Sequence, residues 1–138
     1  MSEHDVALVR RWFELYNARD MDRLAEVCHP DFEKHSVFAG LSGGIFRGPD
    51  RFPEDYFAAI DEAYERFVLE LVELTQGESA VMATTDAHWR GRGSGVEGTR
   101  RLFIVFWSRG ERLIRDRTFN ERAEALAAAA RPIADDAV

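Results

Sequence analysis

Asp116 lies in the segment LIRDRTF, which has the composition of a β-strand and yet carries a carboxylate near its centre. A strand edge that faces water would accommodate such a side chain at little cost. A carboxylate that points into an apolar cavity would instead have a raised pKa, and it would be a candidate general acid or base near neutral pH. The residue alone leaves both interpretations open, so the elements that position it must decide between them.

Apolar residues at helical spacing predict helices in the first half of the chain. Residues 4–18 carry one apolar stripe and predict a first helix, and residues 24–28 predict a short second helix, ended by a His-Pro step. The glycine-rich residues 39–48 are expected to form a loop. Two prolines then mark the start of a third helix, whose predicted apolar face extends from Tyr56 to Phe67.

The second half of the chain alternates apolar and polar residues with the period of β-strands. The predicted strands span residues 31–37, 68–75, 79–90, 99–108 and 112–119. The segment GRGSGVEG forms a longer connection between two of them, and a final helix follows with Asn120 as its predicted N-cap. Helices followed by an antiparallel meander favour an α+β fold, with helices packed on one face of a curved sheet.

Length and charge exclude several classes of protein. A chain of 138 residues with 46% hydrophobic residues can bury one core, so we expect a single domain over residues 1–138, with flexible ends at 1–3 and 132–138. The net charge of -7 opposes nucleic acid or a membrane as a partner. The lone Cys28 can form no internal disulfide and favours a reducing, cytoplasmic setting.

Four stretches of the sequence resemble the NTF2-like superfamily, and in particular its SnoaL-like, ketosteroid-isomerase-like branch. They are WFELYNARDMDRLAEVCHPDFEKHS, FRGPD, GRGSGVE and LIRDRTFNERAEAL. The resemblance covers nearly the whole chain and implies a cone, in which helices and a strongly curved, mainly antiparallel sheet enclose a pocket. Because this fold hosts many reactions as well as binding modules, function must be inferred from the site.

The resemblance implies that Asp116 lies on a strand that lines the cone, where limonene-epoxide-hydrolase-like members have an aspartate after an arginine. Asp86 matches a second aspartate of those members, although Thr84 stands where they have an arginine. Two carboxylates that face one pocket could share a proton and so divide the roles of acid and base. The alternative is that Asp86, His88 and Arg90 form the solvated face of their strand.

His35 stands where SnoaL-like cyclases often carry a histidine, and an imidazole can move a proton at neutral pH. A hydrogen-bonded core or rim position is the alternative for it. Trp12 stands where ketosteroid isomerases have their oxyanion-binding tyrosine, which disfavours true steroid isomerase activity. Tyr16, one helical turn later, could supply a phenol, although both aromatic residues could equally belong to the core.

The remaining ligand-binding candidates are residues expected to wall the pocket. They are Phe38, Phe46, Tyr56, Phe57, Thr84, His88 and Phe119. The spacing of histidines and carboxylates matches no established metal motif, and no phosphate loop or dinucleotide fingerprint is present. We therefore expect neither a metal nor a cofactor.

These observations predict a cofactor-independent acid/base enzyme that acts on a small hydrophobic polyketide-like or terpenoid-like molecule by cyclisation, isomerisation or dehydration. The alternatives are a non-catalytic ligand-binding or dimerisation module, and an epoxide-hydrolase-like enzyme that uses Asp86 and Asp116. Residues 102–107 are apolar on both strand faces, and we expect that the chain's own helices cannot cover one of them. This predicts a homodimer through the convex sheet face.

Overall fold

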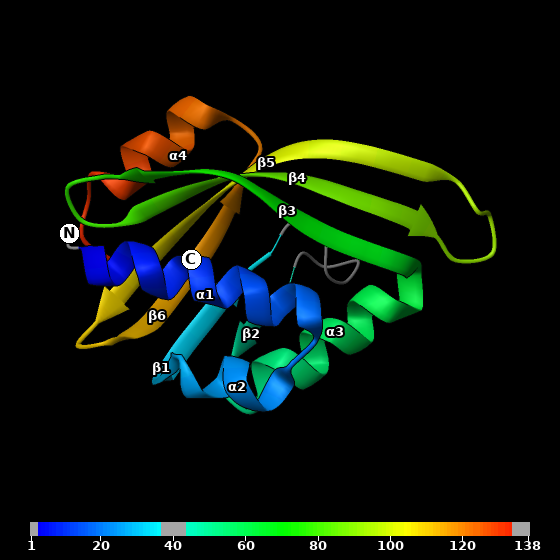
Figure 1. Ribbon diagram of the computed structural model, residues 1–138, viewed down its shortest axis with the longest axis horizontal. Helices are drawn as coiled ribbons and strands as arrows, with labels where there is room; N and C mark the ends of the chain where they lie inside the picture. Colours follow the sequence, from blue (N-terminus) through cyan, green and yellow to red (C-terminus); the bar gives the residue numbers. More distant parts are fainter. Residues whose placement is uncertain (1–2, 37–43, 134–138) are drawn as a thin grey trace.

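The computed structural model describes residues 3–36 and 44–133, which form a six-stranded sheet with helices on both faces (Figure 1). The elements in chain order are α1 (Glu3–Ala18), α2 (Met21–Glu26), β1 (Cys28–His35), β2 (Ile45–Arg47), α3 (Arg51–Ala63), β3 (Tyr64–Gln76), β4 (Val81–Gly91), β5 (Glu97–Arg109), β6 (Arg112–Phe119) and α4 (Arg122–Ala129). The predicted α+β class is confirmed. No helix among these residues has the length and apolar character needed to cross a membrane.

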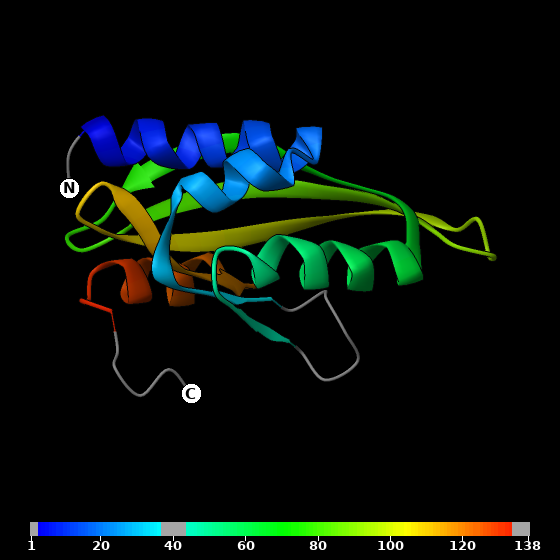
Figure 2. The ribbon, with the colours of Figure 1, turned by 90° about the horizontal axis from the view of Figure 1, so that it is seen from below.

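The strands are arranged in the order β2-β1-β6-β5-β4-β3, and all the pairs are antiparallel except β1 with β6. The parallel pair brings the first strand of the chain beside the last, so residues that are distant in sequence become neighbours. Figure 2 shows β4 and β5 continuing beyond α3 as an extended hairpin. In this strand order, β6 and β5 occupy the middle of the sheet.

The two faces of the sheet carry separate apolar clusters. On the face that we call the inner face, Trp12 and Phe13 of α1 and Phe52 of α3 pack with Leu102 and Phe106 of β5. The amphipathic spacing of α1 explains this contact, because its buried residues all lie on one stripe. Successive side chains of a strand point to opposite faces, so β5 alternates between the two clusters.

The opposite, outer face is partly covered by α4, which lies across the sheet from α1 (Figures 1 and 2). Ala125 and Ala129 of α4 pack against a cluster that includes Phe103, Val105 and Trp107 of β5. The expectation that the protein's own helices cannot cover both faces of this strand is therefore wrong. The homodimer stays a prediction, but it loses this supporting argument.

Some predicted boundaries are corrected. Tyr64 and Phe67 belong to β3 and not to the third helix, because β3 pairs with β4 from Tyr64 onwards and this pairing overrides helical spacing. β2 forms inside the predicted loop by pairing with β1. The N-cap of α4 is Glu121, because the Asn120 side chain accepts a hydrogen bond from Arg100 instead.

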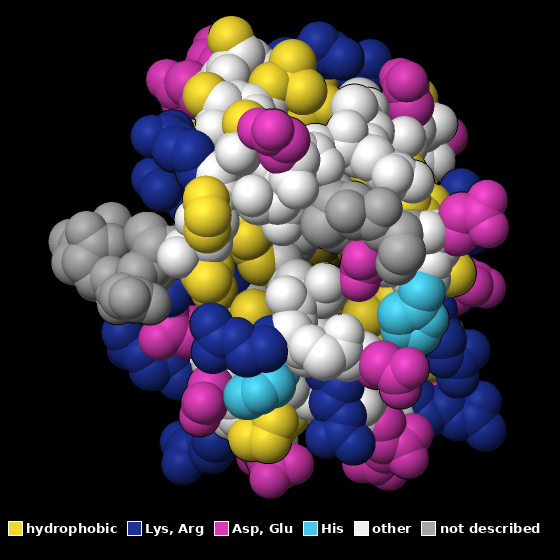
Figure 3. Space-filling view, turned by 90° about the vertical axis from the view of Figure 1, so that its left-hand side faces the viewer, with side chains coloured by type: hydrophobic (Ala, Val, Ile, Leu, Met, Phe, Trp, Pro, Cys, Tyr) yellow, Lys and Arg dark blue, Asp and Glu magenta, His cyan; other side chains and the backbone are white. Residues whose placement is uncertain are grey.

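One end of the molecule is shown in Figure 3, where α1 begins. Acidic and basic side chains surround the hydrophobic ones on this face, and neither sign of charge dominates it. The described surface there is the mixed, solvated kind expected of an ordinary protein surface.

Gly77 gives a test of how α4 is docked. A Cβ atom at this position would lie 2.7 Å from the Ala129 carbonyl oxygen and 2.9 Å from the Ala129 Cβ. The same oxygen accepts hydrogen bonds from the backbone N–H groups of Ser79 and Ala80. We expect Gly77→Ala to lower the free energy of unfolding by about 1–3 kcal/mol, measured by urea denaturation. Glu78→Ala, on the same turn and exposed, is the control, and equal effects of the two would mean that α4 does not pack closely here.

Candidate functional site

A buried ion pair joins β1 to β6 on the inner face. The parallel register places Lys34 opposite Asp116, and the Lys34 Nζ donates to the two carboxylate oxygens at 3.1 and 3.3 Å. The exposed fractions are 1% for Lys34 and 0% for Asp116. The Asp116 side chain is therefore buried, and it does not face water at a strand edge.

Aromatic rings surround this pair. The Lys34 Nζ lies 5.0 Å from the ring centroid of Trp12 and 5.0 Å from that of Tyr56. The negative face of an aromatic ring attracts a cation, so the rings partly replace the water that the ammonium has lost. The result is a charged centre inside an apolar, aromatic environment.

The environment changes the proton affinity of Asp116. Burial raises the pKa of its carboxyl to about 6, against the lowering effects of the Lys34 ammonium and of a hydrogen bond from the His35 backbone N–H. Burial also raises the pKa of the Cys28 thiol, and the Asp116 charge adds to this effect. A carboxyl group with a pKa near 6 can both accept and return a proton close to neutral pH.

Hydrogen-bond donors gather beside the carboxylate. The hydroxyl oxygens of Tyr16 and Tyr56 lie 2.5 Å apart, and burial raises the pKa of each phenol, so both are protonated at neutral pH. Trp12 stacks on Tyr16 with ring centroids 5.0 Å apart, and its buried Nε1 has no hydrogen-bond partner in the described part of the chain. A buried N–H group without a partner raises the free energy of the folded state. This N–H group is therefore available to donate a hydrogen bond to a ligand oxygen.

The inner face contains several of the residues predicted from the sequence. These are Trp12, Tyr16, Phe46, Tyr56, Phe57 and Asp116, which belong to the inner cluster or lie beside it. Phe38 lies outside the described residues. The structure thus brings the helix aromatics to Asp116, as expected, although their roles in binding stay predictions.

Asp86 does not share this environment. Ala83 and Ala87 of β4 belong to the inner cluster, so by alternation the Asp86 side chain points to the outer face, where it pairs with Arg101 at 2.9 and 3.0 Å. The hydrogen bond from Arg101 lowers the pKa of Asp86. The expected pairing of Asp86 with Asp116 in one pocket is therefore wrong, and the hydrolase-like alternative loses its second carboxylate.

His35 also points to the outer face, since it neighbours the inward-pointing Lys34. Its Nε2 lies 3.1 Å from the Glu33 Oε1. Burial lowers the pKa of His35, and the charges of Arg115 and Arg117 oppose protonation further, while Glu33 favours it. The expectation that the His35 ring faces the interior of the cone is corrected by this orientation.

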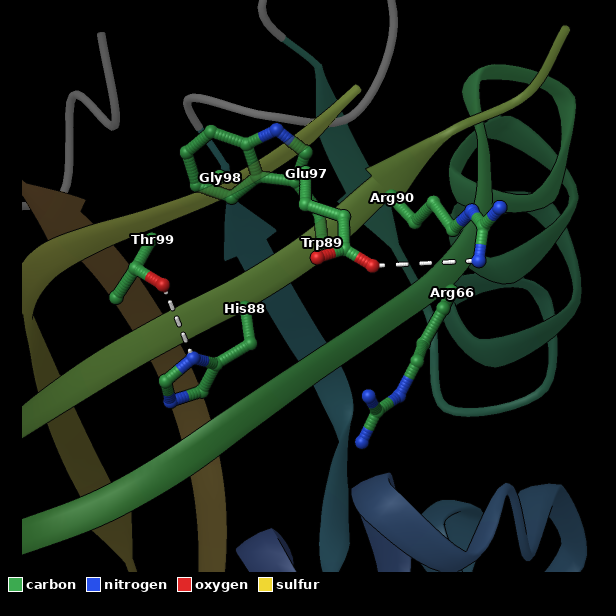
Figure 4. A pocket seen from close by; sticks show the side chains of 7 residues that line it. All are labelled: Arg66, His88, Trp89, Arg90, Glu97, Gly98 and Thr99. Carbon is green, nitrogen blue, oxygen red and sulfur yellow. Dashed lines mark hydrogen bonds and ion pairs between the residues drawn. The ribbon is translucent and has the colours of Figure 1, made fainter. Parts of the chain in front are cut away.

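Thr84, His88 and Phe119 were expected to wall the same pocket, and they too lie on the outer face. Phe119 packs in the outer cluster, because it is three residues from Asp116 and so has the opposite orientation. His88 and Thr99 are hydrogen-bonded to each other and line a hollow of about 400 Å³, which is shown in Figure 4. Trp89 points away from His88 in that view, as alternation along β4 requires.

Arg90, Glu97 and His88, three of the residues that line this hollow, already have partners on the protein surface. Arg90 lies 2.9 Å from a Glu65 oxygen and 4.0 Å from a Glu97 oxygen, and the His88 Nε2 lies 2.8 Å from a Glu70 oxygen. These pairs are exposed to solvent, and exposed ion pairs contribute little to the free energy of unfolding. The hollow is therefore a weaker candidate site than the inner face.

Lys34 is the site residue that sequence reasoning missed. The segment DFEKHS contains three charged or titratable residues in a row, and only strand alternation decides which of them points inward. Phe32 provides the signal that could have identified it. This large apolar residue is buried and lies two positions before Lys34, on the same strand face.

Among residues 3–36 and 44–133, no three His, Cys, Asp or Glu side chains are close enough to hold a metal ion. The groups gathered on the inner face are an ammonium, a carboxyl, two phenols and an indole. Together they can transfer a proton and donate hydrogen bonds to an oxygen atom.

A model of the SnoaL-like domain family matches residues 9–116. TerC, crystallised with polyporic acid, is 16% identical, with a TM-score of 0.74 over 88% of this chain and 94% of TerC. A protein from Catenulispora acidiphila with a ketosteroid isomerase-like fold, in complex with trimethylamine, is 14% identical, with a TM-score of 0.71 over 91% of this chain and 93% of its own.

A third solved structure comes from Xanthomonas campestris pv. campestris and is of a protein proposed to be a polyketide cyclase. It is 18% identical, with a TM-score of 0.70 over 92% of this chain and 97% of its own. A comparison with curated proteins finds no match for this chain. At these identities the solved structures show a shared NTF2-like fold, while the residues of the site have to be judged on their own contacts.

The raised pKa of Asp116 predicts an effect of pH on stability. A carboxyl whose folded pKa of about 6 exceeds its unfolded value near 3.8 stabilises the fold fully below about pH 4, and this contribution is lost as pH rises through 6. Relative to Asp116→Asn, the wild-type free energy of unfolding should fall by about 2–3 kcal/mol between pH 4 and pH 7. Urea denaturation across this range measures the difference, and a constant difference would contradict the raised pKa.

The ion pair itself predicts strong coupling between its members. Lys34→Met should cost about 3–5 kcal/mol at pH 7, because it leaves the Asp116 carboxylate buried without its partner. Asp116→Asn should leave the free energy of unfolding at pH 7 unchanged or raise it, because burial already disfavours the charged carboxyl at this position. The double variant should be more stable than the less stable single variant, as a double-mutant cycle by urea denaturation would show. Asp86→Asn, which breaks only the exposed pair with Arg101, is the control and should have little effect. Additive effects of the two substitutions would mean that Lys34 and Asp116 do not interact.

Proposed function

We propose that this chain, which belongs to the SnoaL-like domain family, is a cofactor-independent acid/base enzyme that uses the Lys34–Asp116 pair. The observation that carries the proposal is a carboxyl group with a pKa near 6, held beside an ammonium and several hydrogen-bond donors inside an aromatic interior. Strongly perturbed titratable groups of this kind are concentrated at functional sites.

In this proposal the Asp116 carboxylate removes a proton from a carbon next to a carbonyl group. The electron pair moves onto the carbonyl oxygen, and the resulting enolate is stabilised by the Trp12 Nε1–H and by the Tyr16–Tyr56 pair. Asp116, now protonated, can return the proton at another carbon, which gives isomerisation. Where a hydroxyl group leaves, the Lys34 ammonium can protonate it to water, which gives dehydration.

The surroundings of the pair support a small hydrophobic substrate. Trp12 and Phe52 stack with ring centroids 6.4 Å apart, and Phe52 and Tyr56 are 5.8 Å apart, so the pair is enclosed mainly by rings. Aromatic walls with few polar groups suit planar, conjugated molecules. A polyketide-like or terpenoid-like carbonyl compound has this chemistry, and TerC, which shares the fold, was crystallised with polyporic acid.

Complete burial favours a second candidate function. Trp12, Lys34 and Asp116 are each 0–1% exposed, so a substrate reaches them only when side chains around the pair move apart. A non-catalytic ligand-binding or dimerisation module would not need that movement, and the ion pair would then serve to define the packing of the inner face. The two functions differ in whether a bound ligand exchanges protons with the protein.

The proposal predicts proton exchange at carbon. In D₂O, the wild-type protein should accelerate hydrogen–deuterium exchange next to the carbonyl of small cyclic ketones and 1,3-diketones, followed by NMR. Asp116→Asn should reduce this rate about a hundredfold or more, because the amide cannot accept the proton. Asp55→Asn, which alters only an exposed pair with Arg51 on α3, is the matched control and should leave the rate unchanged.

Binding measured on the same compounds separates the two candidate functions. A compound that binds to the wild-type protein but exchanges no faster than in buffer would support the ligand-binding module. Equal exchange rates for wild type and Asp116→Asn would exclude Asp116 as the base.

A further inference from the structure

Lys34 is the only lysine in the chain. The sequence contains 18 lysine and arginine residues, and all the others are arginines. Every arginine lies in the described part of the chain, and none of them is buried. Lys34, in contrast, is 1% exposed and is paired with Asp116 on the inner face. The chain therefore uses arginine for its surface cations and an ammonium group for the one in its interior.

The exposed ion pairs show what arginine does for a carboxylate in this protein. Arg101 donates two hydrogen bonds to Asp86, and Arg19 donates two to Asp61, because a planar guanidinium matches both carboxylate oxygens. A guanidinium does not lose its proton in proteins, whereas a buried ammonium can release one and become a neutral amine. A cation that served only to hold Asp116 would be at least as well supplied by arginine. Lysine at this position adds the capacity to become a nucleophile.

We propose that Lys34 is a nucleophile, whose Nζ forms an imine with the carbonyl carbon of a ketone or aldehyde bound on the inner face. Lysine amines in apolar sites form such bonds with carbonyl compounds. The role of Lys34 rests on the proposed function in one respect, since both require a carbonyl compound beside the Lys34–Asp116 pair. They differ in the bond, because Lys34 acts there as a proton donor and here becomes covalently attached to the substrate.

The contact between Lys34 and Asp116 provides the proton transfers that an imine requires. The ammonium passes a proton to the carboxylate along the 3.1 Å contact, which leaves a neutral amine beside a carboxylic acid. The nitrogen lone pair bonds to the carbonyl carbon, and a proton then moves from nitrogen to the oxygen, which gives a carbinolamine. Asp116 returns its proton to the hydroxyl group, which leaves as water while the C=N bond forms. The product is a protonated imine beside a carboxylate, so the total charge is unchanged.

The aromatic surroundings stabilise the species on this path. The Trp12 Nε1–H, which has no partner among the described residues, can donate to the carbonyl oxygen as negative charge develops on it. The rings of Trp12 and Tyr56, each 5.0 Å from the Nζ, attract the protonated imine as they attract the ammonium, because both are cations. Exclusion of water also protects the imine from hydrolysis.

An imine at Lys34 would also define the class of substrate. Its positive nitrogen accepts an electron pair more readily than a carbonyl oxygen does, so the neighbouring C–H group becomes more acidic. Asp116, again a carboxylate, can remove that proton to give an enamine, and its pKa of about 6 is suited to a base near neutral pH. Esters are excluded as substrates, because attack by Lys34 would expel the alcohol and leave a permanent amide. Ketones and aldehydes release the lysine again by hydrolysis.

Reductive trapping in the full wild-type chain tests this role. Cyclohexanone with sodium cyanoborohydride converts an imine into a stable secondary amine, which is located by intact-mass spectrometry and peptide mapping. Because Lys34 is the only lysine, the α-amino group is the only other primary amine in the chain. The matched control is the same chain unfolded in guanidinium chloride, where Lys34 is an ordinary exposed lysine. Trapping at Lys34 should be about tenfold or more faster in the folded chain, because Asp116 is positioned to transfer the protons.

A buried lysine with only a structural role predicts the opposite sign. The fold would then protect Lys34, and slower trapping in the folded chain than in the unfolded chain would overturn the proposal. Equal rates in the two states, or trapping confined to the α-amino group, would overturn it as well. Lys34→Arg keeps a cation beside Asp116 and measures the trapping at the α-amino group alone. If this variant does not fold, the peptide map of the wild-type chain separates the two amines.

Proton exchange in D₂O distinguishes failure of this role from failure of the proposed function. If the wild-type protein exchanges protons but forms no adduct at Lys34, then Lys34 is not a nucleophile and the proposed function stands. If trapping at Lys34 is faster in the folded chain but no exchange occurs, then the imine stands and the proposed function fails.

Discussion

The contact between the Lys34 ammonium and the Asp116 carboxylate is the constraint on which the inner face depends. Each ion loses several kcal/mol of hydration when it is buried, and the partner recovers this only with close geometry. A slip of one residue between β1 and β6 would turn Lys34 or Asp116 to the opposite face and leave a charge unpaired. The pair therefore specifies the parallel register that joins the start of the chain to its end.

Similar ion pairs have different consequences on the two faces of the sheet. Asp86 and Arg101 form the closer, bidentate contact, yet water surrounds them, and the pair contributes little to stability. Lys34 and Asp116 are farther apart, but no water screens them, so their interaction changes the proton affinity of the carboxyl. The distances alone would have predicted, wrongly, that the Asp86–Arg101 pair is the stronger interaction of the two.

The helices determine which face becomes the dry one. Large aromatic residues of α1 and α3 exclude water from the inner face, whereas α4 presents small alanines and covers only the part of the outer face around β5. The rest of the outer face stays polar, with the ion pairs of Asp86 and Glu70 exposed. The sheet thus separates a low-dielectric interior from a solvated surface that holds its strands in register.

The sequence by itself determined the fold class and the residues of the helix stripes. Helical spacing identified the buried stripe of α1, and period-two alternation identified β4, β5 and β6, because both patterns are local properties of the chain. The importance of Asp116 could also be predicted, since a carboxylate within an apolar strand requires an explanation.

Only the tertiary structure decided which face each polar strand residue occupies. The alternation in DFEKHS is compatible with either Lys34 or the pair Glu33 and His35 pointing inward, and the choice depends on pairing with β6, some eighty residues away in sequence. The same holds for Asp86. Only the packing of Ala83 and Ala87 in the inner cluster shows that Asp86 faces the other side of the sheet. The sequence of a strand does not itself show which of its two faces will be covered, because the covering elements are distant in the chain.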